Sequence, residues 1–228
     1  MSKTIIVAGF GPGISSAVAE KFGKSGFSVA LVGRSEDKLA TGVKALEAKG
    51  IKAAAFPTDL SDPAAARALI GKVRSALGPI TVLHWNAYPT AGGDLLATDT
   101  SSFRGVLDIG VVSLLGAIQE ALPDLRQQKD SAILATNGGL AFFDPSVDTM
   151  GVQWNCMGLS VANSAKHKML ALLAEKLKPE GIYVGEVVVT GTVKGTAFDS
   201  GNATLDPAAI ADKFWGLYTA RKDVSTTI

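Results

Sequence analysis

The sequence predicts an α/β fold in which a doubly wound, mostly parallel sheet is flanked by helices. Short apolar runs of strand length alternate along the chain with longer segments of helical periodicity. A glycine-rich turn follows the first apolar run and leads directly into a helical segment. No linker, charge block or internal repeat divides the 228 residues, so we expect one domain over residues 1–228.

The first half of the chain alternates predicted strands with predicted helices. The strands are expected at residues 4–8, 28–32, 52–56 and 81–84, each a short apolar run. The helices between them are expected to run from Ile14 to Gly26, from Ser35 to Gly50, and from Ser61 or Asp62 to Gly78. These bounding residues are typical of helix starts and ends. Pro63 suits the first turn of the third helix because its φ angle is already helical.

The second half repeats this alternation. Helices are expected at 103–122, 155–177 and 207–220, and strands at 132–135 and 182–189. The helix over 103–122 is apolar almost all round, which is equally consistent with a deep core helix and with a subunit interface. Residues 138–151 are expected to form a long loop beside the cleft, either a lid or substrate wall or a surface excursion.

The composition excludes several classes of protein. Hydrophobic residues make up 47% of the chain and charged residues 19%, which is typical of an ordered globular protein. The net charge of +1 gives no field that favours nucleic acid or a membrane surface. The uncharged run 149–165 is too short and too polar for a membrane span. The single cysteine suits the cytoplasm, and two histidines offer no metal cluster.

The glycine-rich turn indicates a phosphate-binding site of the Rossmann type. Glycines let the chain turn tightly and let the backbone approach a pyrophosphate, while the free N–H groups at the start of the next helix face the negative charge. The turn contains Gly9, Phe10, Gly11, Gly13 and Ile14, and we expect these residues to contact a dinucleotide.

The end of the second predicted strand indicates which dinucleotide binds. An NAD site usually has an acidic residue about 20 residues beyond the glycines, where it holds the ribose 2′-hydroxyl. Here that position is Gly33, followed by Arg34 and Ser35. A guanidinium and a hydroxyl suit a 2′-phosphate, so we expect NADP(H) as the cofactor.

Several motifs in order resemble the short-chain dehydrogenase/reductase family. Gly9-x-x-x-Gly13-x-Ser15 is similar to its Gly-x-x-x-Gly-x-Gly. Asp59-Leu60 is similar to the family's pair beside the adenine ring, and Asn86-Ala87-Tyr88 is similar to its Asn-Ala-Gly. Gly191 to Thr196, which includes Val193, is similar to its Pro-Gly-x-x-x-Thr. The resemblance covers about residues 3–217 and implies an NADP(H)-dependent oxidoreductase.

The family's catalytic Asn, Ser, Tyr and Lys are replaced in this chain. In the family the Tyr transfers the proton, the Lys lowers its pKa and holds ribose, the Ser orients the carbonyl and the Asn supports a proton relay. No Tyr-x-x-x-Lys occurs here. Counting back from Gly181 places Leu159 at the Tyr position and Asn163 at the Lys position, whereas a shifted alignment places Ala162 and Lys166 there. Asn137, or alternatively Thr136, stands at the Ser position and Gly110 at the Asn position.

Two hypotheses for function follow from this pattern. The first is an atypical NADP(H)-dependent oxidoreductase of a small carbonyl or alcohol, with Asn137 and Asn163 as replacement residues and Asn163 also contacting the cofactor. Substitute acids are conceivable at Tyr88, Asp144, Lys166, His167 and Lys168, although lysines on a helix usually lie on a solvated face. The second hypothesis is a catalytically silent NADP(H) sensor or partner-binding protein. A homodimer or homotetramer is expected in either case.

Overall fold

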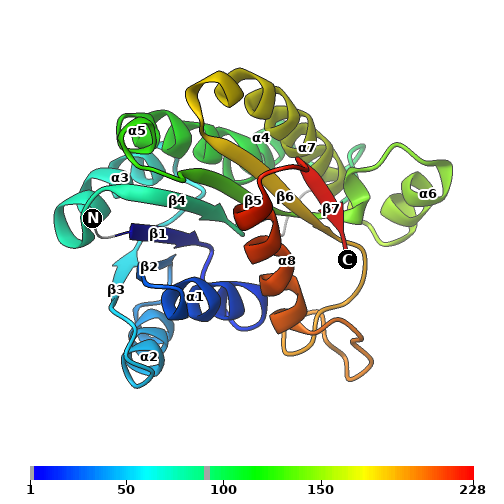
Figure 1. Ribbon diagram of the computed structural model, residues 1–228. Coiled ribbons are helices and arrows are strands. Elements are labelled where there is room, and N and C mark those ends of the chain that lie inside the picture. The colour runs from blue at the N-terminus through cyan, green and yellow to red at the C-terminus, as the bar shows by residue number, and fades with distance from the viewer. Residues whose placement is uncertain (1–2, 90–92) are drawn as a thin grey trace.

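The computed structural model describes residues 3–89 and 93–228, and a parallel sheet runs through its centre (Figure 1). Seven strands are present in these ranges, in the order β3-β2-β1-β4-β5-β6-β7. They are β1 (Lys3–Ala8), β2 (Phe27–Gly33), β3 (Ala53–Pro57), β4 (Ile80–Trp85), β5 (Ala132–Gly138), β6 (Tyr183–Val189) and β7 (Ser225–Thr227). The predicted doubly wound α/β fold is therefore confirmed.

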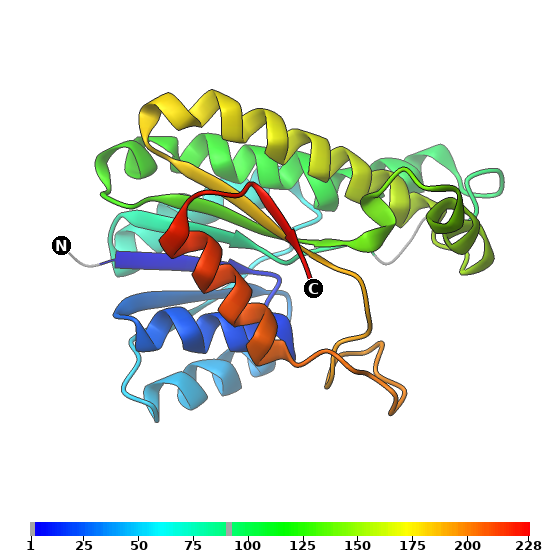
Figure 2. The ribbon, with the colours of Figure 1, turned by 45° about the vertical axis from the view of Figure 1, so that its right-hand side comes forward.

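Helices cover both faces of the sheet (Figure 2). One face carries α1 (Ile14–Lys24), α2 (Glu36–Glu47) and α8 (Pro207–Ala220). The other carries α3 (Pro63–Leu77), α5 (Ser113–Gln127) and α7 (Met157–Leu177). The remaining helical segments are α4 (Thr100–Leu107), a π turn (Asp108–Val112), two short 3₁₀ turns (Gly139–Ala141 and Lys178–Glu180) and α6 (Pro145–Gln153). The two faces pack as two separate hydrophobic clusters against the shared sheet.

Short polar side chains begin several of these helices. The Ser35 hydroxyl accepts from the Lys38 backbone N–H at the start of α2. Asp62, and not the alternative Ser61, caps α3, and its carboxylate accepts from the backbone N–H groups of Ala64 and Ala65. These bonds satisfy backbone donors that have no partner inside the helix.

The prediction of a long loop over residues 138–151 is wrong. This segment contains a 3₁₀ turn and then α6, which begins at Pro145. Asp144 caps α6 by accepting from the Ser146 N–H, and Pro145 occupies the first turn. Asp followed by Pro is a helix-start signal in its own right, but the weak apolar periodicity beyond it hid the helix.

The long apolar helix is present as predicted, and it contains a π turn. The π turn at Asp108–Val112 separates α4 from α5. By length and composition alone the run Thr100–Gln127 could cross a membrane, but 39% of its most apolar segment is buried within this protein. Its sheet-facing residues belong to the core, whereas Val112 on the outer side is exposed. The deep-core interpretation therefore holds for one side only.

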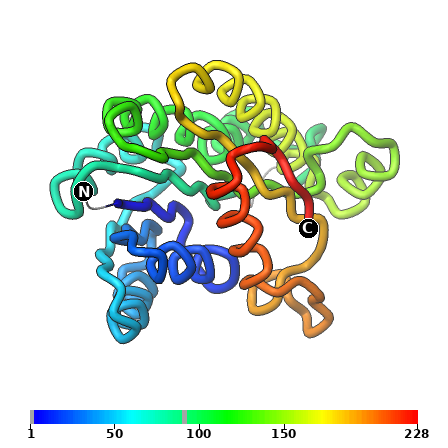
Figure 3. Tube along the Cα trace, in the orientation of Figure 1, coloured from blue at the N-terminus to red at the C-terminus, as the bar shows by residue number. Residues whose placement is uncertain are grey.

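A seventh strand at the C-terminal end was not predicted. Figure 3 traces this segment in red beside β6, at the edge of the sheet opposite β3. Ile228 closes the pairing, because its carbonyl accepts from both the backbone N–H (2.9 Å) and the hydroxyl (2.8 Å) of Thr190. A proline at position 190 could not donate the first of these bonds.

The strand order reverses direction between β1 and β4. The chain moves outward from β1 to β2 and β3, and then returns to place β4 on the other side of β1. In open parallel sheets, ligands bind at the carboxyl ends of the strands at such a reversal. This position is where the glycine-rich turn lies.

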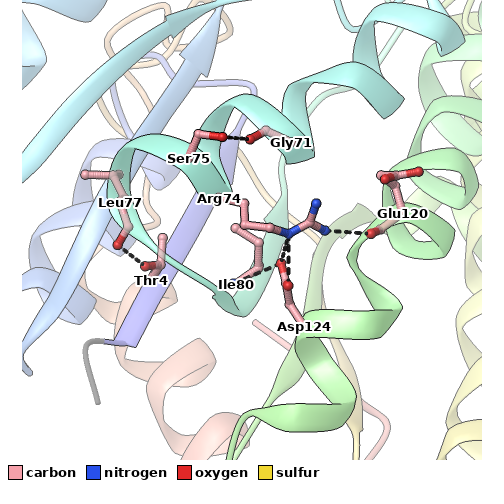
Figure 4. A network of polar contacts seen from close by, with 8 residues as sticks. All are labelled: Thr4, Gly71, Arg74, Ser75, Leu77, Ile80, Glu120 and Asp124. Carbon is pink, nitrogen blue, oxygen red and sulfur yellow. Dashed lines mark hydrogen bonds and ion pairs between the residues drawn. The ribbon is translucent and has the colours of Figure 1, made fainter.

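A partly buried ion pair joins two helices on the α3–α5 face (Figure 4). The Arg74 Nε on α3 lies 2.9 Å from both carboxylate oxygens of Asp124 on α5, and its Nη2 donates to the Glu120 carbonyl (3.1 Å). Asp124 also accepts from the Ile80 backbone N–H (3.3 Å) at the start of β4. One carboxylate therefore fixes α3, α5 and β4 together.

Asp124→Ala should lower the free energy of unfolding by about 2 kcal/mol, because the partly buried Arg74 guanidinium and the buried Ile80 N–H would lose their acceptor. Urea unfolding measures the change. Glu120→Ala is the matched control on the same helix: it keeps the backbone carbonyl that Arg74 uses, so its effect should stay within about 0.5 kcal/mol. Equal losses for both variants would contradict this account.

Candidate functional site

The turn between β1 and α1 requires glycine at its first position. Gly9 has a φ of +83°, and its N–H and that of Phe10 both donate to the Val32 carbonyl on β2 (3.0 and 2.7 Å). A Cβ atom at Gly9 would lie 2.6 Å from the Ala87 backbone nitrogen, just after β4. No side chain fits in that space, so the turn and the end of β4 are in direct backbone contact.

Side-chain hydroxyls and an amide hold the turn in place. Ser15 Oγ donates to the Gly9 carbonyl and Ser16 Oγ to the Gly11 carbonyl, both at 2.7 Å. Asn86, at the end of β4, donates from Nδ2 to Ser15 Oγ (2.7 Å). The serine that replaces the third glycine of the family motif is thus a brace for the turn.

The start of α1 is open to an anion. Gly13 is the N-cap of this helix, and no side chain caps it and no acidic residue lies in the first turn. A Cβ atom at Gly11 would meet nothing within 4 Å. Free backbone N–H groups and the positive end of the helix dipole therefore face open space, as phosphate binding needs. Thr196, from the segment after β6, lies against Gly13 on one side.

The turn is supported from behind by Phe10. A Cβ atom on Gly42 of α2 would lie only 2.5 Å from the Phe10 ring, so the ring sits directly on that helix. The side chains of Phe10 and Ile14 pack against the core. Only their backbone atoms are placed to face a ligand at this turn.

The end of β2 carries an exposed positive charge. Gly33 is packed beside the Phe10 carbonyl, Arg34 is exposed, and the Ser35 hydroxyl caps α2 but keeps its own proton to donate. Asp59, after β3, has its pKa lowered by hydrogen bonds from Ser61 and by the charge of Arg34. The structure therefore brings these predicted residues to one edge of the sheet.

Leu60 and Ala87 differ from their polar neighbours in being buried. Leu60 lies in the core cluster on the α3 side, and Ala87 lies against Gly9. Both residues therefore help to position the backbone at the strand ends and expose little side chain to a ligand.

The segment after β6 forms a wall of the site. Val193 is buried and pairs with Leu205, the Gly191 position is packed on Leu205, and Thr196 Oγ1 donates to the Val193 carbonyl (2.8 Å). Further along, the Phe198 ring lies 5.9 Å from the Tyr88 ring, which follows β4. Partial burial raises the pKa of Tyr88, so its phenol remains protonated at neutral pH.

The structure brings Asn137 and Asn163 together at the end of β5. Asn137 Nδ2 donates to the Asn163 carbonyl (3.1 Å) and to Glu186 Oε2 (3.0 Å), and its Oδ1 accepts from the Gly138 N–H (3.0 Å). Its amide is therefore engaged beneath α7. The Asn163 amide instead lies beside Gly138, where a Cβ atom would be 2.9 Å from its nitrogen.

The other two replacement positions are apolar. A Cβ atom on Gly110 would lie 3.2 Å from the Ala162 methyl group, so the π turn and α7 pack closely there. Leu159 is half-buried one turn before Asn163. Thr136 faces the opposite side of the sheet, where its hydroxyl lies 3.4 Å from His84 Nε2. Burial lowers the pKa of His84 to about 3.

A buried charged cluster lies under α7 that the sequence pattern did not predict. Glu186, in the middle of β6, is 1% exposed and pairs with His167 as well as with Asn137. Lys166 is 2% exposed, so the expectation of a solvated helical lysine is wrong for it, although it holds for Lys168. The available signal was an acidic residue inside an otherwise apolar strand, since such a charge needs a partner.

Asp144 is unsuitable as a substitute acid. Hydrogen bonds from the hydroxyl and N–H of Ser146 lower the pKa of this exposed capping carboxyl, which keeps it ionised. The pKa of Lys166 is lowered as well, but for an ammonium a lowered pKa favours the neutral form. Burial lowers it to about 8, and the negative charge of Glu186 only partly offsets this.

The lowered pKa of Lys166 predicts a stability that changes with pH. Between pH 8 and 10.5 the folded chain loses this proton while the unfolded chain keeps it, so the free energy of unfolding should rise with pH. Relative to Lys166→Met, the wild-type protein should gain up to about 3 kcal/mol over this interval. Urea unfolding at pH 7.5 and pH 10 measures it, and a constant difference between the two proteins would disprove it.

A family model described as short chain dehydrogenase matches residues 3–204 of the chain. Among curated proteins, a short chain dehydrogenase of Pseudocercospora fijiensis is 30% identical over 149 residues, covering 64% of this chain and 48% of that protein. The 3-oxoacyl-[acyl-carrier-protein] reductase FabG of Staphylococcus aureus is 28% identical, covering 59% and 55%. The chain thus spans about half the length of these relatives in the matched regions.

Solved structures agree with the fold over nearly the whole chain. A short-chain dehydrogenase/reductase of Serratia marcescens has a TM-score of 0.86 at 20% identity and covers 100% of this chain and 96% of its own. A short chain dehydrogenase of Burkholderia cenocepacia, solved in complex with NADP, has a TM-score of 0.83 at 23% identity and covers 99% and 96%. Taken with the family model, these likenesses show that the chain belongs to the short-chain dehydrogenase/reductase family.

Proposed function

We propose that residues 1–228 form one NADP(H)-binding domain that transfers hydride between the cofactor and a small carbonyl or alcohol. The observation that carries this proposal is the uncapped start of α1 under an open glycine turn, with Arg34 exposed at the end of the neighbouring strand. Family membership supports the reaction class. The NADP complex of the Burkholderia cenocepacia relative is consistent with the cofactor.

The residues present fit this cofactor. The space over Gly11 is open, Gly9 and Gly13 give the backbone its tight turn, and the first N–H groups of α1 would hold the pyrophosphate. Arg34 and Ser35 would bind the 2′-phosphate, and Asp59 with Leu60 would lie beside the adenine. Asn86, Ala87, Gly191 and Val193 would position the backbone around the dinucleotide.

The chain's own residues would supply orientation more than proton transfer. The bound nicotinamide carries the hydride chemistry. Asn163 would hydrogen-bond a ribose hydroxyl through its amide without contributing charge, and Asn137 would fix the backbone at the end of β5. Leu159 keeps water out of the position where the family has a proton donor, so we infer a slower reaction than the family's usual rate.

The alternative is a catalytically silent NADP(H)-binding sensor or partner-binding protein. It is favoured by one specific observation: three of the four replaced positions offer no free polar group to a substrate. The amide of Asn137 is used internally, Gly110 is packed on Ala162, and Leu159 carries no polar atom.

We further propose a cytoplasmic homodimer or homotetramer. Apolar residues are exposed on the outer sides of the π turn and α7, namely Val112, Val161 and Leu172. Covering such residues with a second copy would bury them from water.

Arg34→Ala should weaken NADPH binding about 10- to 100-fold, because a charge-assisted contact to the 2′-phosphate is lost. Binding of NADH should change less than about threefold, since NADH has no such phosphate. Isothermal titration calorimetry with both nucleotides measures this. Lys72→Ala, an exposed cation on α3, is the matched control and should leave both affinities unchanged. Equal losses for NADPH and NADH with Arg34→Ala would remove the basis for NADP(H) preference.

Leu159→Tyr combined with Asn163→Lys should raise carbonyl reduction by a factor of about 100 or more, because general acid catalysis contributes about 10²–10⁴-fold. NADPH oxidation with a panel of small aldehydes and ketones measures kcat/KM. Leu159→Phe with Asn163→Lys is the control, because it has the ring and the cation but no phenol hydroxyl. If both double variants fold, bind NADPH and remain equally inactive, the silent alternative is favoured.

A further inference from the structure

Two aromatic rings meet beside the glycine-rich turn without belonging to the core. The ring centroids of Tyr88 and Phe198 lie 5.9 Å apart, and the ring planes are inclined by 41°. Tyr88 is 39% exposed and Phe198 is 63% exposed. Because much of each ring stays in water, the rings gain only part of the stabilisation that burial would give. The stability of the fold therefore does not explain why both positions are aromatic.

The pair stands on the two chain segments that touch the glycine-rich turn. Ala87, directly before Tyr88, is in backbone contact with the first glycine of the turn. Thr196, two residues before Phe198, lies against the last glycine of the turn, where α1 begins. The rings therefore meet at the carboxyl ends of the strands, which is where ligands of such sheets bind.

The backbone holds both rings in place. Pro89 directly follows Tyr88, is buried, and restricts the Tyr88 backbone towards extended conformations. On the other segment, the Asp199 carboxylate accepts from the N–H groups of Gly195 and Gly201, both at 2.9 Å. These bonds close a compact loop around the second ring. The pair is thus preorganised, which lowers the entropy cost of binding a ligand to it.

Such a pair distinguishes aromatic groups from aliphatic ones. Aromatic rings in offset or edge-to-face contact attract each other beyond the apolar area that they bury, whereas an aliphatic group gains only the area contribution. Both rings keep exposed area that a third ring can cover. The hydroxyl of Tyr88, which stays protonated because partial burial raises its pKa, adds a donor for a polar substituent.

We propose that Tyr88 and Phe198 bind the aromatic ring of the substrate, so that the carbonyl or alcohol taken by this protein is an aryl compound. This inference rests on the proposed function. The pair adjoins the turn that would hold the cofactor, so a substrate bound to the rings stands next to the dinucleotide. The two rings determine specificity and take no part in the transfer of hydride.

The test compares benzyl alcohol with cyclohexylmethanol, which has the same carbon skeleton but no aromatic ring. Cyclohexylmethanol is the more apolar of the two, so burial of apolar area alone would favour it. Ligand-observed NMR titrations, with and without saturating NADP⁺, measure both dissociation constants. The wild-type protein should bind benzyl alcohol about three- to tenfold more tightly, which is the range that an aromatic contact contributes.

Substitutions at the two rings should remove this preference. Phe198→Leu and Tyr88→Leu each keep apolar volume but lose a ring, so each should bring the two affinities within about twofold of each other. Tyr88→Phe keeps the ring and should keep the preference. Phe143→Leu is the matched control, because Phe143 is a 93% exposed ring outside the pair, and it should leave both affinities unchanged.

Each other outcome overturns the inference. No binding of benzyl alcohol to the wild type, or binding no tighter than that of cyclohexylmethanol, does so directly. A preference that survives both leucine variants, or that Phe143→Leu also removes, does so as well. Weaker NADP⁺ binding in the leucine variants with an unchanged aryl preference assigns the rings to the cofactor instead. If the wild type binds no NADP⁺, the proposed function fails, while the titration without cofactor still decides whether the pair selects aryl groups.

Discussion

The contact between Gly9 and the end of β4 is the constraint on which the rest of the site depends. Two strand ends meet here backbone to backbone, with no room for a Cβ atom. Asn86 and Ser15 then hold the turn through hydrogen bonds, so that α1 begins at a fixed height above the sheet. Because this contact lies where the strand order reverses, it places the start of α1 at the position where ligands bind in such sheets.

The half of the site nearest the turn could be predicted from sequence because its chemistry is local. Gly9 to Gly13, Arg34 and Asp59 follow their strands within a few residues, so the position of each strand places them. Helix α6 was missed because its Asp144-Pro145 start is not followed by strong apolar periodicity. Strand β7 was missed because three residues give no period, and its pairing with β6 joins residues far apart in the sequence.

The other half could not be predicted, since its contacts join residues far apart in sequence. Asn137 meets Glu186 and the backbone of Asn163 only because β5, β6 and α7 are stacked. From the sequence, Lys166 looks like a surface residue, and only the packing of α7 on the sheet shows that it is buried. The two halves of the crevice therefore differ: the turn side offers open backbone donors, whereas the α7 side holds buried charged and amide side chains under a helix.

The ring of Phe10 gives the phosphate turn a mechanical link to the back of the molecule. It lies between the turn and Gly42, a glycine of α2 that faces away from any ligand. A single methyl group at that helix would push the ring, and the ring would push the turn. The proposed nucleotide affinity is thus open to change by substitutions on a helix that lies behind the turn, with every proposed contact residue unchanged. Close relatives that share all their site residues can therefore differ in how tightly they hold the same cofactor.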